Sequence, residues 1–597
     1  MRFDSKLDAG LGLTSRQQLF AETWFNQVHE FSLDAFRVRV MNPVNILEEL
    51  MKSLSDSLFD SADRTRIWGE LVAIFEDAAL LDSNHFKKAK RELLLLIKEA
   101  LAKPKESEKH HALIDAYSRE LHNELRHRYI SECTGWLASE LNTVHAGAGE
   151  DPALMNIEKT TGQLLSCLVA AGWSIESLYK MYRTTFTSDV LHTEPGQPYS
   201  FTAALTWMFT RLGREHKDYR VTFVINQISN AGAIPEVVGD ISFNANPPVV
   251  AEASPESAKK FAKPGGTKLF ATMAVKANDG RIAGMRAAAH IEQVLDVVRY
   301  DFLKQNFTLS DSFLVEKEDK HILLNIVKTV PNPSREVTQQ ELHDFMTRLG
   351  NLVSSGTLRE ESKDRIYSAF RLYRTGAETS NLENKLVNWW TALEYLVKAG
   401  GSGGIGLAVE NALFPTVTFS YVVKHLEASR TAMRHLNVEL KDPAGSLIDY
   451  TNMKPAELFM LLADTKVQSC IKIAVAASPY ASLYFKKLFQ KMSTPEALNS
   501  TLEKHEQAVK WQVQRIYRAR CDIVHSAGRV DQAALLCANL ESYLKTLLDN
   551  FLQSLNDLQT MRAPKEFFDR QRYSYERVMA SLKAKDSSLL LEKLSVT

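Results

Sequence analysis

Arg520 and His525 stand near the end of a helical pattern, with four residues between them. An arginine holds a phosphate through paired N–H bonds and keeps its charge at any physiological pH. A histidine takes or gives a proton near pH 7. With a ribose 2′-OH as internal nucleophile, these two side chains would suffice to cleave an RNA phosphodiester without a metal or a cofactor.

The spacing alone is weak evidence for such a site. The chain contains 16 histidines, and about one chance match to this spacing is expected from composition. The same spacing occurs at Arg211 with His216 and at Arg430 with His435. We interpret both of these pairs as solvated surface residues.

The surroundings of Arg520 set its pair apart. Apolar residues recur around it at helical spacing, at Val509, Val513, Ile516 and Val524. Arg520 therefore falls on the apolar stripe of its own helix, where an unpaired charge is costly. We expect a carboxylate or a bound phosphate beside it.

The helical geometry raises a question about the pair. Five steps of about 100° place His525 about 140° around the helix from Arg520. Either the helix ends near Val524, or the two residues belong to sites completed by another subunit. The sequence favours an end there, because Gly528 follows and Asp531 is a good N-cap. The next helix is expected to bury one face, formed by Leu536, Leu540, Tyr543, Leu544, Leu547 and Phe551.

Three blocks of this chain resemble the HEPN superfamily of ribonucleases, specifically its Apea-like group. The first is 517–528, with an arginine, a polar residue, apolar positions, histidine and a glycine. The second is 388–396, similar to the family's aromatic-rich helix with an inward glutamate, here Glu394. The third and weaker block is 365–373. The resemblance covers residues 360–556, about one third of the chain.

The resemblance implies roles for individual residues. Arg520 and His525 are the expected catalytic pair, and Glu394 is expected to orient the arginine. A buried Arg520–Glu394 ion pair that only fixes helix packing is the structural alternative. Cys521 stands where this group often has asparagine, and cysteine is a weak hydrogen-bond donor.

Further polar residues surround the pair. Asp522 supplies polarity beside Cys521, in a different direction. Arg515 and Arg518 are expected to contact RNA, within a local excess of basic residues between 501 and 530.

The family also implies a function. HEPN nucleases usually dimerise and bring two Arg/His sets into one cleft, so a homodimer through this domain is expected. The resemblance implies a metal-independent endoribonuclease that leaves a 2′,3′-cyclic phosphate. It further implies antiphage defence by abortive infection, with tRNA or mRNA as target and a phage-derived activator. The N-terminal region would then be a sensor or regulator.

Two other functions are weighed against this one. A catalytically silent HEPN bundle that binds RNA or a protein gains weight from Cys521. A DNA regulator would use the turn at 172–174, with Ser174 as the N-cap of the next helix. That helix has only Lys180 and Arg183 as basic residues, so an ordinary helical hairpin is favoured.

Composition gives the general class of the protein. Zero net charge and 24% charged residues are typical of a globular protein, and they place any RNA site in a local patch. Five widely spaced cysteines argue against a disulfide framework and favour the cytoplasm. No CxxC or HExxH motif points to zinc, and no apolar run reaches the length of a membrane span.

The order of patterns predicts a multidomain, mainly α protein. Strand-like alternation appears at 219–225, 269–275, 312–315 and 322–330, and 281–302 is helical. The GxGxxG in 400–406 follows a helix, so we interpret it as a flexible loop. The predicted parts are a helical domain 1–215, a small α+β domain 216–335, a helical linker 336–359, a HEPN-like helical bundle 360–556 with an insertion at about 400–500, and a tail 557–597.

Overall fold

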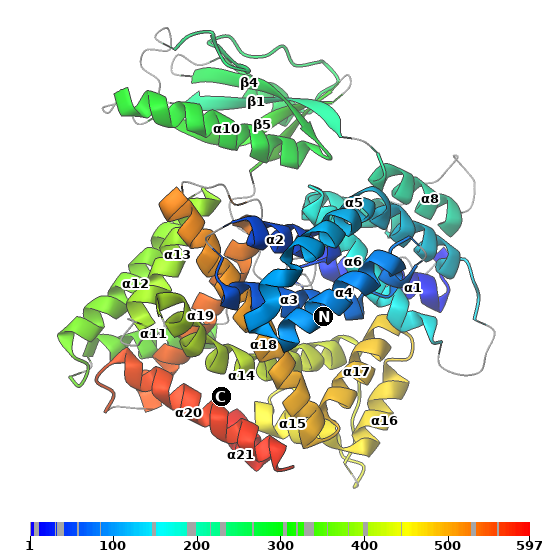
Figure 1. The fold of residues 1–597 in the computed structure, drawn as a ribbon, viewed down its shortest axis with the longest axis vertical. Coiled ribbons are helices and arrows are strands. Elements are labelled where there is room, and N and C mark those ends of the chain that lie inside the picture. The colour runs from blue at the N-terminus through cyan, green and yellow to red at the C-terminus, as the bar shows by residue number, and fades with distance from the viewer. Residues whose placement is uncertain are drawn as a thin grey trace. The chain divides into compact units, whose positions relative to one another are not determined.

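The computed structural model describes two compact units (Figure 1). The helical unit combines residues 1–167, 186–202 and 330–597, and the sheet unit combines 168–185 and 203–329. The description leaves out residues 1, 5–6, 8–10, 30–31, 33–40, 57–58, 84, 146–150, 188–198, 215, 227–233, 265–267, 302–306, 318–319, 327–338, 355, 380, 398–403, 443, 527–529, 531–532, 558–559 and 597.

Helices make up the N-terminal part of the chain, and several begin at strong caps. The side chains of Thr14 and Asn42 cap the first two helices in reciprocal capping boxes with Gln17 and Asn45. Pro43 occupies the first position of the second helix, where its missing N–H costs nothing. The helices are α1 Ser15–Val28, α2 Pro43–Ser55, α3 Ser61–Asp77, α4 Lys87–Ala102, α5 His111–Leu141, α6 Ala153–Ala170, α7 Ile175–Phe186 and α8 Phe201–Leu212, with 3-10 turns Ala79–Asp82 and Pro104–His110.

The C-terminal part of the helical unit contains a bundle built around one helix. Helix α13 contacts α12, α18 and α19, so it is the centre of the bundle. The remaining helices extend this bundle. Their bounds are α11 Gln339–Ser354, α12 Glu360–Glu378, α13 Leu382–Val397, α14 Gly404–His435, α15 Pro455–Ala463, α16 Thr465–Ala474, α17 Pro479–Met492, α18 Pro495–Ser526, α19 Ala533–Asp557, α20 Pro564–Lys583 and α21 Ser588–Val596.

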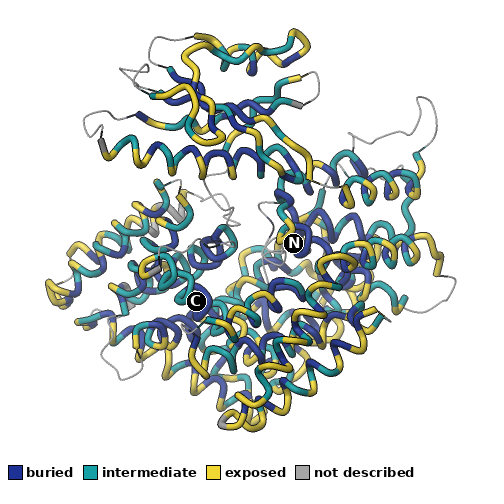
Figure 2. Tube along the Cα trace, turned by 45° about the horizontal axis from the view of Figure 1, so that its top comes forward, coloured by how far each residue is buried: buried dark blue, intermediate teal, exposed yellow. Residues whose placement is uncertain are grey.

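The bundle core is aromatic and aliphatic. Trp389 and Trp390 of α13 are buried, and the stripe Val509, Val513 and Ile516 of α18 is almost completely removed from water. Figure 2 shows such buried stripes alternating with exposed positions along the helices. Each fully buried side chain of this size stabilises the fold by about 1.5–3 kcal/mol, so the stripe fixes which face of α18 points inward.

The sheet unit contains a six-stranded sheet in which each strand is antiparallel to its neighbours. The order across the sheet is β2-β3-β4-β1-β5-β6. Residues 247–263 contribute α9 Glu256–Phe261, which contacts β6. The strands are β1 Lys217–Asn226, β2 Val237–Val238, β3 Ile241–Asn244, β4 Lys268–Ala277, β5 Thr308–Lys317 and β6 Lys320–Asn325.

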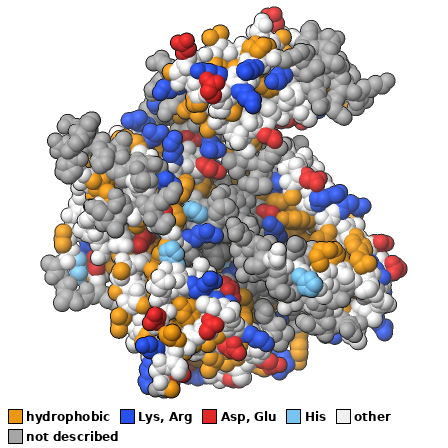
Figure 3. All heavy atoms as spheres, turned by 180° about the vertical axis from the view of Figure 1, so that it is seen from behind, with side chains coloured by type: hydrophobic (Ala, Val, Ile, Leu, Met, Phe, Trp, Pro, Cys, Tyr) orange, Lys and Arg blue, Asp and Glu red, His pale blue; other side chains and the backbone are white. Residues whose placement is uncertain are grey.

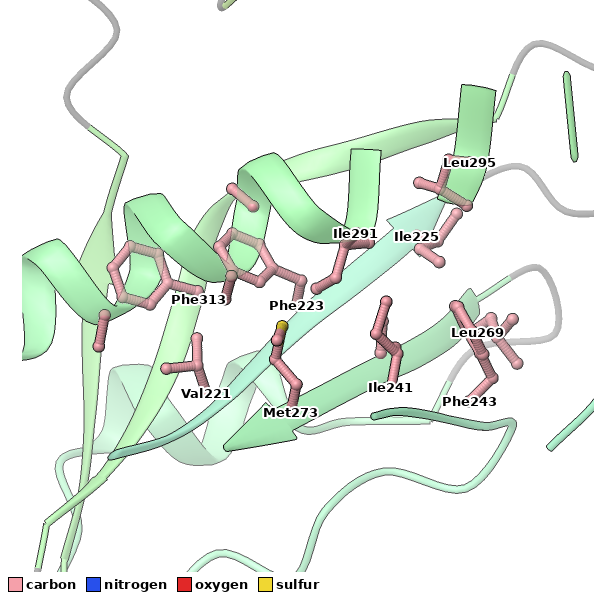
Figure 4. Packing of buried hydrophobic residues seen from close by; sticks show 14 of the residues in the cluster. Val221, Phe223, Ile225, Ile241, Phe243, Leu269, Met273, Ile291, Leu295 and Phe313 are labelled. Carbon is pink, nitrogen blue, oxygen red and sulfur yellow. The ribbon is translucent and has the colours of Figure 1, made fainter. Parts of the chain in front are cut away.

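Helix α10 Gly280–Asp301 covers one face of this sheet (Figure 4). Phe223 and Phe313 stack with their ring centroids 5.0 Å apart, and Ile291 of α10 lies in the same cluster. Gly284 allows the close approach of the helix, because a Cβ there would lie 2.1 Å from the ring of Phe313. The core of the sheet unit therefore depends on one small residue of the helix.

Several predictions can be compared with this fold. The prediction of a mainly helical protein with a small sheet region is confirmed. The strand expected at 322–330 ends at Asn325, with 327–330 outside the described residues. The two separate helical domains expected at 1–215 and 360–556 largely share one compact unit.

The surface carries charges of both signs. Figure 3 shows one face, on which the described Lys and Arg side chains are interspersed with Asp and Glu. This mixing agrees with the net charge of zero. A helix able to cross a bilayer does not occur in the described part of the chain.

Candidate active site on helix α18

Helix α18 carries both Arg520 and His525, and it continues through Ser526. The helix thus ends two residues past the end expected near Val524, and the backbone is still helical at His525. The two side chains leave one helix about 140° apart around its axis and about 7.5 Å apart along it. Arg520 is partly buried and His525 is exposed. Within one chain, the two residues do not face a common point.

Arg520 has the carboxylate partner that its buried position requires. Its Nη2 lies 3.4 Å from each carboxylate oxygen of Glu394 on α13. The indole N–H of Trp390 donates to Glu394 Oε1 at 2.7 Å, which fixes the carboxylate. Both charged side chains are about one fifth exposed. The expected ion pair is thus present, and Glu394 holds the guanidinium from one side.

One donor of Arg520 remains without a partner. Its Nε is buried and has no acceptor among the described residues. An unsatisfied buried donor costs about 1–3 kcal/mol. The distance of 3.4 Å to Glu394 is also at the long end for a charge-assisted hydrogen bond. The arginine is therefore held in place but not fully satisfied by the protein.

Tyr517 and Cys521 form the wall beside Arg520. The ring of Tyr517 packs against Trp390 with centroids 5.6 Å apart. Burial raises the pKa of Tyr517, and the nearby Cys521 raises it further.

The glycine-rich segment has a packing role at this wall. Gly401 and Gly403 lie outside the described residues, and Gly404 begins α14 with a φ of +74°. A Cβ on Gly406 would lie 2.6 Å from the ring of Tyr517. Gly406 therefore allows α14 to approach α18 closely, and it lies inside a helix instead of the expected loop.

Arg515 and Arg518 are committed to carboxylates of the N-terminal helices. Arg515 donates to Glu49 at 2.8 Å and also pairs with Glu70. Arg518 donates to Glu49 at 2.7 Å and to Asp63 at 2.8 Å. Arg515 is buried, so the expectation that it contacts RNA is not met in this arrangement, and both terminal nitrogens of Arg518 already donate to carboxylates.

The electrostatics of this cluster follow from its geometry. Burial alone would raise the pKa of Glu49, but Arg515 and Arg518 outweigh it and hold that pKa below its ordinary value. Glu70 forms an ion pair with Arg515 alone of the two arginines. Burial therefore outweighs the attraction and keeps the pKa of Glu70 above its ordinary value. We refer to Glu49, Glu70, Asp63, Arg515 and Arg518 as the arginine–carboxylate cluster. It joins α18 to α2 and α3.

Asp522 also points to the N-terminal helices. Its carboxylate lies 3.0 Å from Lys52 Nζ of α2. Positions two apart on a helix do not face each other, so Asp522 does not share the side of Arg520. The supporting role expected for Asp522 is therefore separate from the Arg520–Glu394 pair.

Sequence reasoning missed a cavity of about 470 Å³ among α14, α17, α18 and α19. Lys487 and Lys491 line it, four residues apart on one face of α17. That spacing was the available signal, but the sequence alone did not show that Lys424 of α14 meets the same space.

Chemically, the α18 site offers an oriented cation and an exposed imidazole. Among the described residues, no group of three or more potential ligands is arranged for a metal ion. Comparisons with protein-family models, with curated proteins and with solved structures found no match to this chain.

Proposed function

We propose that this protein is a metal-independent endoribonuclease of the HEPN type, with Arg520 and His525 as its catalytic pair. The observation that carries the proposal is the placement of Arg520. Arg520 follows the buried stripe Val509, Val513 and Ile516 on α18, and it pairs with Glu394, whose carboxylate accepts from Trp390. An oriented cation of this kind is what stabilisation of a charged transition state requires.

In the proposed reaction, the ribose 2′-OH attacks the adjacent phosphorus. His525 accepts the 2′ proton or protonates the leaving 5′ oxygen, and Arg520 stabilises the charged phosphorane. The P–O2′ bond forms as the P–O5′ bond breaks. The products carry a 2′,3′-cyclic phosphate and a 5′-OH.

A homodimer is part of this proposal. Because His525 lies about 140° around α18 from Arg520, one copy would contribute the arginine and the other copy the histidine to each scissile phosphate. His525 is exposed and so is available to a second copy. The expected assembly is a dimer through the C-terminal bundle.

The proposed setting is antiphage defence by abortive infection in the bacterial cytoplasm, with tRNA or mRNA as substrate. An unregulated ribonuclease would kill its own cell, so a control region is needed. The contact of α2 and α3 with α18 through the arginine–carboxylate cluster supports a regulatory role for the N-terminal helices. A phage-derived activator would act through them.

The direct test is RNA cleavage by EDTA-treated protein, with the new RNA ends mapped chemically. The substitution His525→Ala should lower cleavage at least about 100-fold, which is the usual contribution of a general acid or base. His216→Ala is the matched control, because His216 follows Arg211 at the same spacing and is exposed. Cleavage that survives His525→Ala in a folded protein refutes the proposal.

The second candidate is a catalytically silent bundle that binds RNA or a protein. The continuous helix α18, which directs the two residues to different sides, favours it, as does Cys521 at the position where asparagine is expected. In that case wild-type protein yields no cleavage products at any concentration. Arg520→Ala would still weaken RNA binding in a filter or fluorescence-anisotropy assay.

A further inference from the structure

The cavity among α14, α17, α18 and α19 is lined by more positive than negative side chains. Three lysines line it, Lys424, Lys487 and Lys491, together with one carboxylate, Glu158. Glu158 is almost fully buried and lies 2.7 Å from Lys487 Nζ. The remaining two ammonium groups give the lining a positive excess.

The partners of those two lysines are neutral. Lys491 Nζ donates to the hydroxyl of Tyr421 at 3.0 Å, and Lys424 Nζ reaches Thr546 Oγ1 at 3.4 Å. Within the described part of the chain, neither has a carboxylate within 4.0 Å, and Asp549 acts on Lys424 only from farther away. Because Glu158 is paired with Lys487, the other two cations of this cavity can form a site for an anion, and phosphate is a frequent ligand of lysine.

Aromatic rings form another part of the wall. Tyr421 stacks on His505 with centroids 4.2 Å apart and an interplanar angle of 26°. Tyr484 lies beside His425 in a second stacked pair. Burial first, and then His425, Lys424 and Lys491, lower the pKa of His505 to about 3, so its ring is neutral at pH 7. These surfaces suit a flat aromatic group.

The cavity also contains polar groups that could form hydrogen bonds with the edge of a bound aromatic ring. The amides of Gln512 and Asn539 line the cavity and are joined by a hydrogen bond of 2.7 Å. Each amide carries further donor and acceptor capacity beyond that single bond. Ser542 adds a hydroxyl to the lining. The cavity thus combines cations, stacking surfaces and hydrogen-bonding groups.

We propose that this cavity binds a small ligand in which a phosphate is joined to an aromatic ring, namely a mononucleotide. The volume of about 470 Å³ lies within the range of small-molecule sites and is too small to enclose a folded RNA. Lys424 and Lys491 hold the phosphate, and Tyr421 with its neighbours contacts the base. The inference does not depend on the proposed ribonuclease activity.

The test is isothermal titration calorimetry of the full chain with AMP, GMP, CMP and UMP. At least one of these should bind at one site per chain. The corresponding nucleoside and inorganic phosphate should each bind at least about tenfold more weakly, because each keeps only half of the contacts. A tenfold change corresponds to about 1.4 kcal/mol.

Substitutions locate the binding in the cavity. Lys424→Gln and Lys491→Gln should each weaken mononucleotide binding at least about tenfold, since each removes a charged hydrogen bond to the phosphate. Lys472→Gln is the matched control, because Lys472 is exposed on α16 and does not line the cavity. The affinity of the Lys472→Gln variant for mononucleotides should equal that of the wild type.

A third variant keeps the test decisive if the lysine variants fold poorly. Ala508 lines the cavity at an exposed position, so Ala508→Trp should fold and obstruct the site. The proposal is overturned if no mononucleotide binds at millimolar concentration, or if Lys424→Gln, Lys491→Gln and Ala508→Trp all bind like the wild type. It is also overturned if inorganic phosphate binds as tightly as the nucleotides, or if single-stranded RNA displaces them at far lower concentration.

Discussion

Glu394 decides how Arg520 is held. It accepts from Trp390 at 2.7 Å and faces the guanidinium at 3.4 Å, whereas the Arg520 Nε has no acceptor among the described residues. The carboxylate of Glu394 thus compensates the charge of Arg520, which would otherwise be unpaired on the apolar stripe of α18. An arginine supported on one side keeps its other side for a phosphate, which is the arrangement that the ribonuclease proposal requires.

The substitution Glu394→Gln should destabilise the protein by about 1–2 kcal/mol, because it leaves a partly buried cation without its partner. Urea unfolding at pH 7 measures this change. Glu361→Gln on α12 is the control, because Glu361 pairs with Arg365 but remains largely exposed. Equal effects of the two substitutions would show that the Arg520–Glu394 pair contributes no more than a surface ion pair.

At the scale of the elements, small residues determine how closely the helices approach. Gly406 lies against Tyr517, and Gly376 of α12 lies against Trp389 of α13 in the same way. Both contacts are closer than a Cβ could tolerate. The wall beside Arg520 is therefore positioned by a glycine of another helix.

The substitution Gly406→Ala should destabilise the protein by about 1–3 kcal/mol, because the added methyl group would overlap the ring of Tyr517. The control is Gly135→Ala in the middle of α5, where a Cβ meets nothing within 4 Å. There the higher helix propensity of alanine should stabilise by about 0.5–1 kcal/mol. Opposite shifts in urea midpoints would support the packing role, and shifts of the same sign would contradict it.

Helices and long strands could be predicted from the sequence because their signals are local. The apolar stripe of α18 and the alternation of β1 are visible over several turns or residue pairs. Strand β2 has two residues, and α9 has six, so neither gives a periodic pattern. Helix α18 ends at Ser526, two residues past the end expected near Val524, because a glycine such as Gly528 marks a helix end only to within a few residues.

The candidate site could be predicted only in part, for a similar reason. The pairing of Arg520 with a carboxylate could be predicted, because an unpaired charge on an apolar stripe is costly. That stripe is visible in the sequence of a single helix. The partners of Arg515 and Arg518 come from α2 and α3, and no local pattern links those helices to α18. The cavity lysines come from two helices and were missed for the same reason.

At the scale of the whole molecule, the arginine–carboxylate cluster joins distant parts of the chain. Glu49 bridges Arg515 and Arg518, and its side chain is only 13% exposed. Removing one partner of such a group leaves buried charge uncompensated. The integrity of the helical unit should therefore depend on this carboxylate more than on any surface pair.

The substitution Glu49→Gln should cost about 3 kcal/mol of unfolding free energy at pH 7. The pKa of Glu49 is lower in the folded protein than in the unfolded chain, so its contribution is present above the ordinary glutamate value and is lost as pH falls through the folded value. The loss of stability on acidification should consequently be smaller in the variant. Urea unfolding between pH 7 and pH 3 measures both effects.

Glu378→Gln is the control for this pH series, because Glu378 and its partner Arg374 are both largely exposed. It should leave the unfolding free energy and its dependence on pH close to those of the wild type. The prediction fails if Glu49→Gln behaves like Glu378→Gln over the whole range.

The bond between Glu49 and Arg515 spans 466 positions of the chain. A ribosome adds about 5–20 residues per second, so roughly half a minute or more of translation separates the two residues. During that time the carboxylate of Glu49, which is largely buried in the folded protein, has not yet been joined by its partner Arg515. The supply of chaperones during translation should therefore govern the yield of native protein.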